Sequence, residues 1–258
     1  MTRLWAPSPH VGTLHFDPAS LAERWTRLHR GDTEPLPDND ALMAGWVLFH
    51  NGEFQRAAEA GQRLGGRGLT LANKATCIHA SYVEPSEPLR LERLQAAASR
   101  AQAQQISDPN NPNAWYWQGY AIGRYSQGIS VAKALARGLG SQVRRALERT
   151  IALAPTHADA HLALANFHAE VIHKVGALIG SMTYGASKDA GLSLYQRAMA
   201  LNPDSAITLA ECAQGLVMLE GDASLDRATG LLQQAARFDP LDAMEHLYVD
   251  SARMALQG

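Results

Sequence analysis

The chain has 258 residues, of which 46% are hydrophobic, and its formal net charge is −2. This length permits a sizeable core in one domain or one elongated array. The near-neutral charge argues against a nucleic-acid binder, which would be strongly basic. Only two cysteines occur, Cys77 and Cys212. Both lie among apolar residues far apart in sequence, so we expect buried thiols rather than a disulfide or a metal pair.

The N-terminal residues contain no apolar run of the kind that forms a signal peptide. No later stretch reaches the roughly 18 apolar residues that a membrane span requires. With Met1 as the native start, the sequence therefore predicts a cytoplasmic protein without a membrane span. Strand signals are scarce, whereas Ala, Leu, Arg, Gln and Glu are frequent, which favours helix throughout.

Residues 1–37 are interpreted as an N-terminal extension with one short packing helix. Within residues 18–29, Leu21, Trp25 and Leu28 share one helical face. Asp17 is expected to be the N-cap, and Pro18 occupies the first helical position, where its missing N–H costs nothing.

From residue 38 onward the sequence predicts helix pairs. The first pair covers residues 41–50 and 53–64, with a turn at Asn51-Gly52. The second pair covers about 69–83 and 87–107, and Pro85 and Pro88 separate its helices.

Four prolines then punctuate the chain in a similar way, each ending one helix before a polar turn and an Ala-rich segment. They are Pro109, Pro155, Pro203 and Pro240. The pattern predicts a helical repeat domain over 38–258. Its units are expected at about 38–71, 72–111, 112–157, 158–205 and 206–242, with a capping helix at 243–258.

The third unit carries a pattern of known type. Residues Trp115-x-x-Gln118-Gly119-x-x-Ile122 resemble the Trp-x-x-Leu-Gly-x-x-Tyr signature of tetratricopeptide repeats. Tyr195-Gln-Arg-Ala198, followed by Pro203, resembles the end of that repeat. The resemblance implies an all-α fold, a right-handed superhelical array of antiparallel helix pairs. Small residues are expected where the paired helices cross. These are Gly45, Gly119, Ala165 and Ala213.

Two consecutive units are longer than the family's repeat of about 34 residues. Pro109 and Pro155 lie 46 positions apart, Pro155 and Pro203 lie 48 apart, and Pro203 and Pro240 lie 37 apart. The additional residues fall at 124–140 and 168–187. Extended central repeats of this kind resemble the regulator-of-microtubule-dynamics family and the T component of some periplasmic transport systems, which partners a solute-binding protein.

In tetratricopeptide arrays the first helix of each pair lines a concave groove. The resemblance therefore implies groove positions in three successive units, spaced three or four residues apart on one helical face. Polar and aromatic side chains at these positions suit a protein or peptide partner, although a solvated inner surface would show the same pattern. The expected partner-binding residues are Asn113, Tyr116, Tyr120, Arg124, Asp159, Asn166, Glu170 and Gln214. Leu162, Ile207, Ala210 and Met218 complete the same face.

The two insertions supply further candidate contacts. Lys133 and Arg137 lie in the first insertion, and Lys174 and Tyr184 lie in the second. Arg144, Arg145 and Arg149 continue a basic segment after the first insertion. This segment could hold an anionic partner, but a solvated helix face is the simpler interpretation.

No residue set predicts catalysis, a metal or a cofactor. His157 and His161 have the i, i+4 spacing of metal ligands, but no His-Glu-x-x-His motif contains them, so half-buried histidines are expected, as for His168. Neither a nucleophile elbow nor a Gly-rich phosphate loop occurs.

Two functions remain. The first is a non-enzymatic adaptor or scaffold that binds a protein or peptide through the groove and the insertions. The alternative is a small or apolar ligand held in a cavity that the insertions close. Homo-oligomerisation through an apolar face of the last helix is also left open; that face contains Met244, Leu247, Val249 and Met254. Of the adjacent tryptophans, Trp115 is expected in the core and Trp117 outside it, because residues two apart do not share a helical face.

Overall fold

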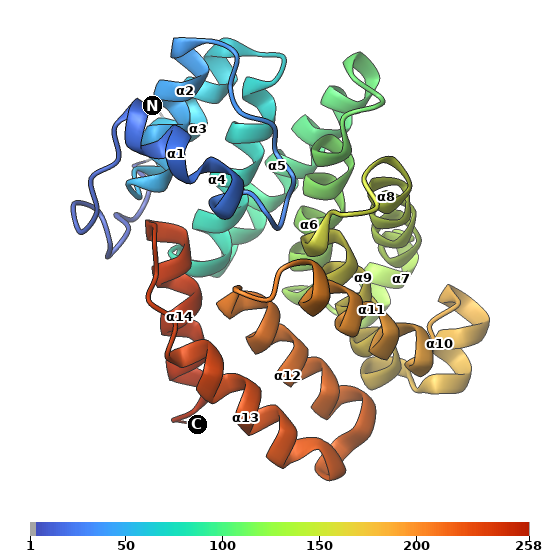
Figure 1. The fold of residues 1–258 in the computed structure, drawn as a ribbon. Coiled ribbons are helices and arrows are strands. Elements are labelled where there is room, and N and C mark those ends of the chain that lie inside the picture. Colours follow the sequence, from blue (N-terminus) through green and yellow to red (C-terminus); the bar gives the residue numbers. More distant parts are fainter. Residues whose placement is uncertain (1–3, 258) are drawn as a thin grey trace.

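The computed structural model describes residues 4–257, and every helix, turn and loop in that range fits an all-α fold, with no β-strand in the range. Successive helices run antiparallel and stack into one array (Figure 1). The prediction of an all-α repeat fold is therefore confirmed. The helices are α1 (Pro18–Leu28), α2 (Asp40–His50), α3 (Phe54–Leu64), α4 (Gly68–Tyr82), α5 (Glu87–Ser107), α6 (Pro112–Gln127), α7 (Val131–Ala136), α8 (Leu139–Leu153), α9 (Ala158–Val175), α10 (Ala177–Tyr184), α11 (Lys188–Leu201), α12 (Ala206–Glu220), α13 (Leu225–Ala236) and α14 (Ala243–Ala255), with a 3-10 turn at Gly221–Ser224.

Helix starts follow the local signals in the sequence. Asp17 caps α1 by accepting a hydrogen bond from the Ser20 amide at 2.8 Å, and Pro18 occupies the first position, as predicted. Asn111 caps α6 in the same way, accepting from the Asn113 amide at 3.0 Å. A side-chain acceptor satisfies an amide that has no partner within its own helix, which fixes where the helix begins.

Glycines lie where neighbouring helices approach each other closely. A Cβ at Gly119 would lie 3.1 Å from the side chain of Leu147, where α6 crosses α8. A Cβ at Gly45 would lie 2.6 Å from Leu71. The prediction that these two positions must be small is confirmed, because a larger residue would separate the helices.

The two insertions form short helices beside lengthened ones. The first insertion contains the end of α6 and all of α7, and the second contains the end of α9 and all of α10. Both therefore lie next to the pair formed by α6 and α9. Gly138 and Gly185, both in the left-handed region with φ of 61° and 63°, end α7 and α10.

The two ends of the array touch each other. Figure 1 shows α14 returning to the side of the molecule that holds α1 to α4. His50 of α2 and Asp242, the N-cap of α14, form a fully buried pair at 2.7 Å. Arg27 of α1 pairs with Glu245 of α14 at 2.8 Å. The array is thus closed into a ring.

Ring closure places much of the apolar face of α14 in the core. Met244, Leu247 and Val249 are buried, and only Met254 of the predicted face is exposed, at 64%. Most of this face is therefore covered by the chain itself, which leaves little of it for a second copy.

The core also corrects one prediction and confirms another. Trp117 is buried, whereas Trp115 is partly exposed and donates from Nε1 to the carbonyl oxygen of Pro109 at 2.9 Å. The expected roles of the two tryptophans are therefore reversed. Cys77 and Cys212 are free, buried thiols, as predicted.

Within residues 4–257, no helix is both long and apolar enough to cross a membrane.

Candidate functional site: a cavity between the extended repeats

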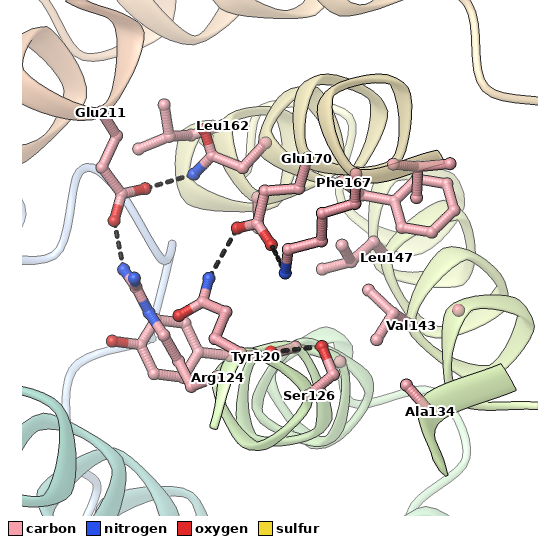
Figure 2. Close-up of a pocket in the computed structure, with 18 of the residues that line it drawn as sticks. Tyr120, Arg124, Ser126, Ala134, Val143, Leu147, Leu162, Phe167, Glu170 and Glu211 are labelled. Atoms are coloured by element: carbon pink, nitrogen blue, oxygen red, sulfur yellow. Dashed lines mark hydrogen bonds and ion pairs between the residues drawn. The ribbon is translucent and has the colours of Figure 1, made fainter. Parts of the chain in front are cut away.

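A cavity of about 150 Å³ lies between α6, α8 and α9. Both insertions contribute to its wall, α7 through Val131 and Leu135 and the second insertion through Val175 and Tyr184. Figure 2 shows Val143, Leu147 and Phe167 on one side, Arg124 and Glu211 on the opposite side, and Glu170 between them. The cavity is therefore apolar on one wall and polar on the opposite one.

Most charges on the polar wall are already paired within the protein. Arg124 pairs with Glu211, which also accepts from the Asn166 amide. Asn166 in turn accepts from the Tyr195 hydroxyl at 2.6 Å. Because these groups satisfy one another, this part of the wall is a fixed polar network rather than a set of free binding groups.

A second network lies at the mouth of the cavity. Gln127 donates to one oxygen of Glu170 at 2.6 Å, and Lys174 donates to the other at 3.2 Å. These contacts join the end of α6 to α9. Lys174 is partly exposed and pairs within its own helix, so we attribute little stability to this ion pair.

Tyrosines form the inner part of the wall. Burial raises the pKa of Tyr82, Tyr116 and Tyr248 well above the usual value, and it also raises that of Tyr120. Their hydroxyls are therefore neutral at physiological pH and act as hydrogen-bond groups; Tyr120, for example, donates to the Ser81 hydroxyl at 3.2 Å.

Asp159 differs from the other charged side chains of the wall. Its backbone amide donates to the Gly31 carbonyl at 3.0 Å, but its carboxylate has no hydrogen-bond or ion-pair partner among residues 4–257. Burial raises the pKa of Asp159 to about 7, and the nearby charge of Asp32 adds to that effect. An unpaired carboxylate in a cavity wall is a candidate recognition group.

The structure brings most of the predicted groove residues to this cavity. Gln214 lies instead on a neighbouring hollow beside α12. Tyr116 lines the cavity although only 5% of its surface is exposed. The predicted residues that line the cavity are Tyr116, Tyr120, Arg124, Asp159, Asn166 and Glu170, together with Lys174 and Tyr184 of the second insertion.

Two predicted insertion contacts lie elsewhere. Lys133 is exposed on α7 and is not part of the cavity wall. Arg137 follows α7 and donates to the Tyr125 hydroxyl at 3.0 Å. Neither Lys133 nor Arg137 is among the residues that line the cavity.

Asn113 is a correction to the predicted groove. The segment after α1 covers it, so that its side chain is only 1% exposed. Its amide donates to Glu34 at 2.8 Å and to the Asp32 carbonyl at 3.0 Å, and its oxygen contacts His157 at 3.1 Å. Asn113 therefore offers no surface to a partner in this structure; it fixes the N-terminal segment inside the ring.

A buried polar network beneath that segment was not anticipated from sequence. Asp32 accepts from Lys74 at 2.7 Å and contacts His29 at 2.8 Å. His29 contacts His50 at 3.2 Å, and His50 contacts Asp242 at 2.7 Å. Burial lowers the pKa of His29 to about 4, which favours its neutral form. The network joins α1, α2, α4 and α14, and no motif signals it because its members are scattered in sequence.

The three histidines considered as metal ligands each bind a separate group. His161 contacts the Pro155 carbonyl at 3.1 Å, and His168 accepts from the Ser187 amide at 3.2 Å. His157 contacts Asn113, as described. Among the described residues no group of three or more His, Cys, Asp or Glu side chains is placed to hold a metal ion.

The chain is similar to known proteins in its structure and not in its sequence. No family model matches the sequence. No curated protein matches it either. TTC0263, a thermophilic TPR protein of Thermus thermophilus, is similar in structure, with a TM-score of 0.58, 16% identity, and coverage of 83% of this chain and 97% of that chain.

The MamA protein is also similar, with a TM-score of 0.42 and 16% identity, covering 76% of this chain and 87% of that chain. At 16% identity, the similarity to TTC0263 shows a shared fold but says nothing about function. The chain therefore has a tetratricopeptide-like helical-repeat fold.

Proposed function

We propose that the chain binds a small, largely apolar molecule in the cavity between α6, α8 and α9. One observation carries the proposal: both extended repeats contribute side chains to a single cavity wall. Of the two functions that the sequence suggests, this geometry favours ligand binding, because ring closure and the N-terminal segment fill part of the groove. The proposal involves no catalytic step.

The apolar wall decides the kind of molecule. Leu147, Phe167 and Val171 line it, and Leu162 and the small Ala163 of α9 also line the cavity. Burying a CH₂ group contributes about 0.8 kcal/mol. An eight-carbon chain could thus gain at most about 6 kcal/mol, a Kd of roughly tens of micromolar before the cost of association.

Octanol is a suitable neutral probe, and isothermal titration calorimetry measures its binding. Ala163→Phe places a ring in the cavity, whereas Ala200→Phe makes the same change at an exposed position of α11. We expect the wild type and Ala200→Phe to bind alike and Ala163→Phe to bind at least about tenfold more weakly. Absence of octanol binding to the wild type, or equal binding by folded Ala163→Phe, contradicts the proposal.

The adaptor hypothesis is a second candidate, favoured by the surface of α10. Leu178, Ile179 and Met182 are 75%, 59% and 81% exposed on this short helix. Neighbouring exposed apolar side chains are typical of protein-binding surfaces. We propose that a protein or peptide partner would contact α10 rather than the filled part of the groove.

The partner hypothesis is tested by comparing proteins that co-purify with the wild type and with Leu178→Glu/Met182→Glu. We expect the double variant to lose a specific partner that Ala163→Phe retains. If the wild type and the double variant co-purify with the same proteins, the partner hypothesis is contradicted. Membership of the regulator-of-microtubule-dynamics and T-component group, and a cytoplasmic location, remain proposals that rest on the sequence alone.

A further inference from the structure

The cavity adjoins a smaller, more polar pocket on the N-terminal side of the ring. This pocket has a volume of about 40 Å³ and is lined by residues of α1, α4, α6, α9, α12 and α14. Tyr116, Asp159, Ile207 and Tyr248 line both hollows. A molecule in the apolar cavity can therefore place one end against this shared wall.

Two residues that line the small pocket each carry a buried polar atom that the protein leaves unsatisfied. Asn202 and Trp117 both line it, and neither Asn202 Oδ1 nor Trp117 Nε1 has a hydrogen-bond partner among residues 4–257. The two side chains are 7% and 2% exposed. A buried polar group without a partner costs about 1–3 kcal/mol, so this arrangement favours a polar occupant.

Among the charged side chains that line the small pocket, one carboxylate has no ion-pair partner in the described part of the chain. Arg27 is paired with Glu245 at 2.8 Å, and Lys74 is paired with Asp32 at 2.7 Å. The carboxylate of Asp159 remains without a counter-charge in the described part of the chain. The local balance therefore favours a cation.

Gly31 allows Asp159 to take this position. A Cβ at residue 31 would collide with the carboxylate, so any larger residue there would displace it. The rings of Tyr116, Tyr248 and Trp117 also line the pocket. Aromatic faces attract cations, and a carboxylate and an amide oxygen accept hydrogen bonds from an ammonium group.

We propose that the ligand of the cavity carries a protonated amine, which binds at Asp159 while the apolar part occupies the cavity. This inference rests on the proposed ligand-binding function and names the chemical class of its ligand. The proposed acceptor is the carboxylate of Asp159, and the unpartnered side-chain oxygen of Asn202, a residue that lines the small pocket, is the second.

Three probes with the same chain length and different head groups test the inference. Octylamine, octanol and octanoate are titrated into the wild type and into Asp159→Asn by calorimetry at pH 8. We expect octylamine to bind the wild type at least about tenfold more tightly than octanol, and octanoate to bind most weakly, because the head group faces an unpaired carboxylate. In Asp159→Asn the preference for octylamine over octanol should disappear, because the variant has no negative charge to pair with the ammonium group.

The outcomes separate this inference from the function on which it rests. If octanol binds but octylamine is not preferred, or if folded Asp159→Asn keeps the preference, the small pocket holds only water and the amine assignment is overturned. If none of the probes binds the wild type, the ligand-binding function itself is overturned, and the amine assignment with it. Asn202→Ala provides a second variant, in which octylamine should weaken and octanol should not.

Discussion

Replacing Lys74 with methionine removes the cation from the buried network while keeping most of the side-chain volume. Lys74 Nζ lies 2.7 Å from Asp32 Oδ2, and the two side chains are 3% and 2% exposed. The ammonium also lies 5.2 Å from the centre of the Phe49 ring.

Breaking a buried ion pair by removing one partner costs about 3–5 kcal/mol, because the other charge is left uncompensated. His29, which contacts Asp32 at 2.8 Å, remains in the variant. We therefore expect Lys74→Met to lower the free energy of unfolding by about 3 kcal/mol at pH 8, the lower end of that range.

The loss should depend on pH in a defined direction. Burial raises the pKa of Asp32, but the charge of Lys74 and the hydrogen bonds from His29 and Lys74 outweigh this effect and hold the pKa well below its usual range. This stabilisation is present above the unfolded pKa of about 3.9 and is lost as pH falls through the folded value. Without Lys74 the folded pKa rises, protonation relieves the unpaired charge, and the deficit should be smaller at pH 5 than at pH 8.

Urea unfolding followed by circular dichroism measures both effects. Asp32→Asn/Lys74→Met is the matched control, because it removes both charges and should recover part of the lost stability. A loss below about 1 kcal/mol for Lys74→Met would refute the reasoning, since it would lie within the range of ordinary surface changes. The same conclusion follows if the double variant is as unstable as Lys74→Met.

Three further predictions concern other sites. Gly215→Ala should lower stability by about 1–3 kcal/mol, because a Cβ there collides with the Tyr195 ring; Gly230→Ala, in open space on α13, should not, and equal melting temperatures would contradict this. Burial raises the pKa of Cys77 to about 12 and of Cys212 to about 11, so neither should react with Ellman's reagent at pH 8 until the protein is unfolded; rapid labelling of the native state would be inconsistent with this burial. Burial raises the pKa of Asp159 to about 7. The affinity for octylamine should therefore fall about tenfold from pH 8 to pH 6, as the carboxylate is protonated, while the affinity for octanol stays constant. A constant octylamine affinity over this range would exclude Asp159 as its acceptor.

The elements that sequence predicts well are those specified by neighbouring residues. Asp17 and Pro18 locate the start of α1, and Gly119 marks the crossing of α6 and α8. The additional residues in the third and fourth units likewise indicate where α7 and α10 lie, beside the cavity. Helix periodicity and capping act within a few residues, so a single sequence reveals them.

Contacts between distant residues could not be predicted in this way. His50 and Asp242 are 192 positions apart, and nothing around either residue signals that they meet. The burial of Asn113 depends on Glu34, 79 positions earlier, in a segment expected only to pack on the array. Asp159 was assigned to the groove by its repeat position, but its lack of a partner emerges only when its surroundings are known.

The contact between α2 and α14 has a consequence for how this fold can change. In an open solenoid, units can be gained or lost because each touches only its neighbours. Here the second helix and the last one meet, with His50 and Asp242 at 2.7 Å. Duplication of one unit would move α14 away from α2 and leave His50 and Asp242 buried without each other, so additional residues are accommodated better within a unit, where α7 and α10 lie.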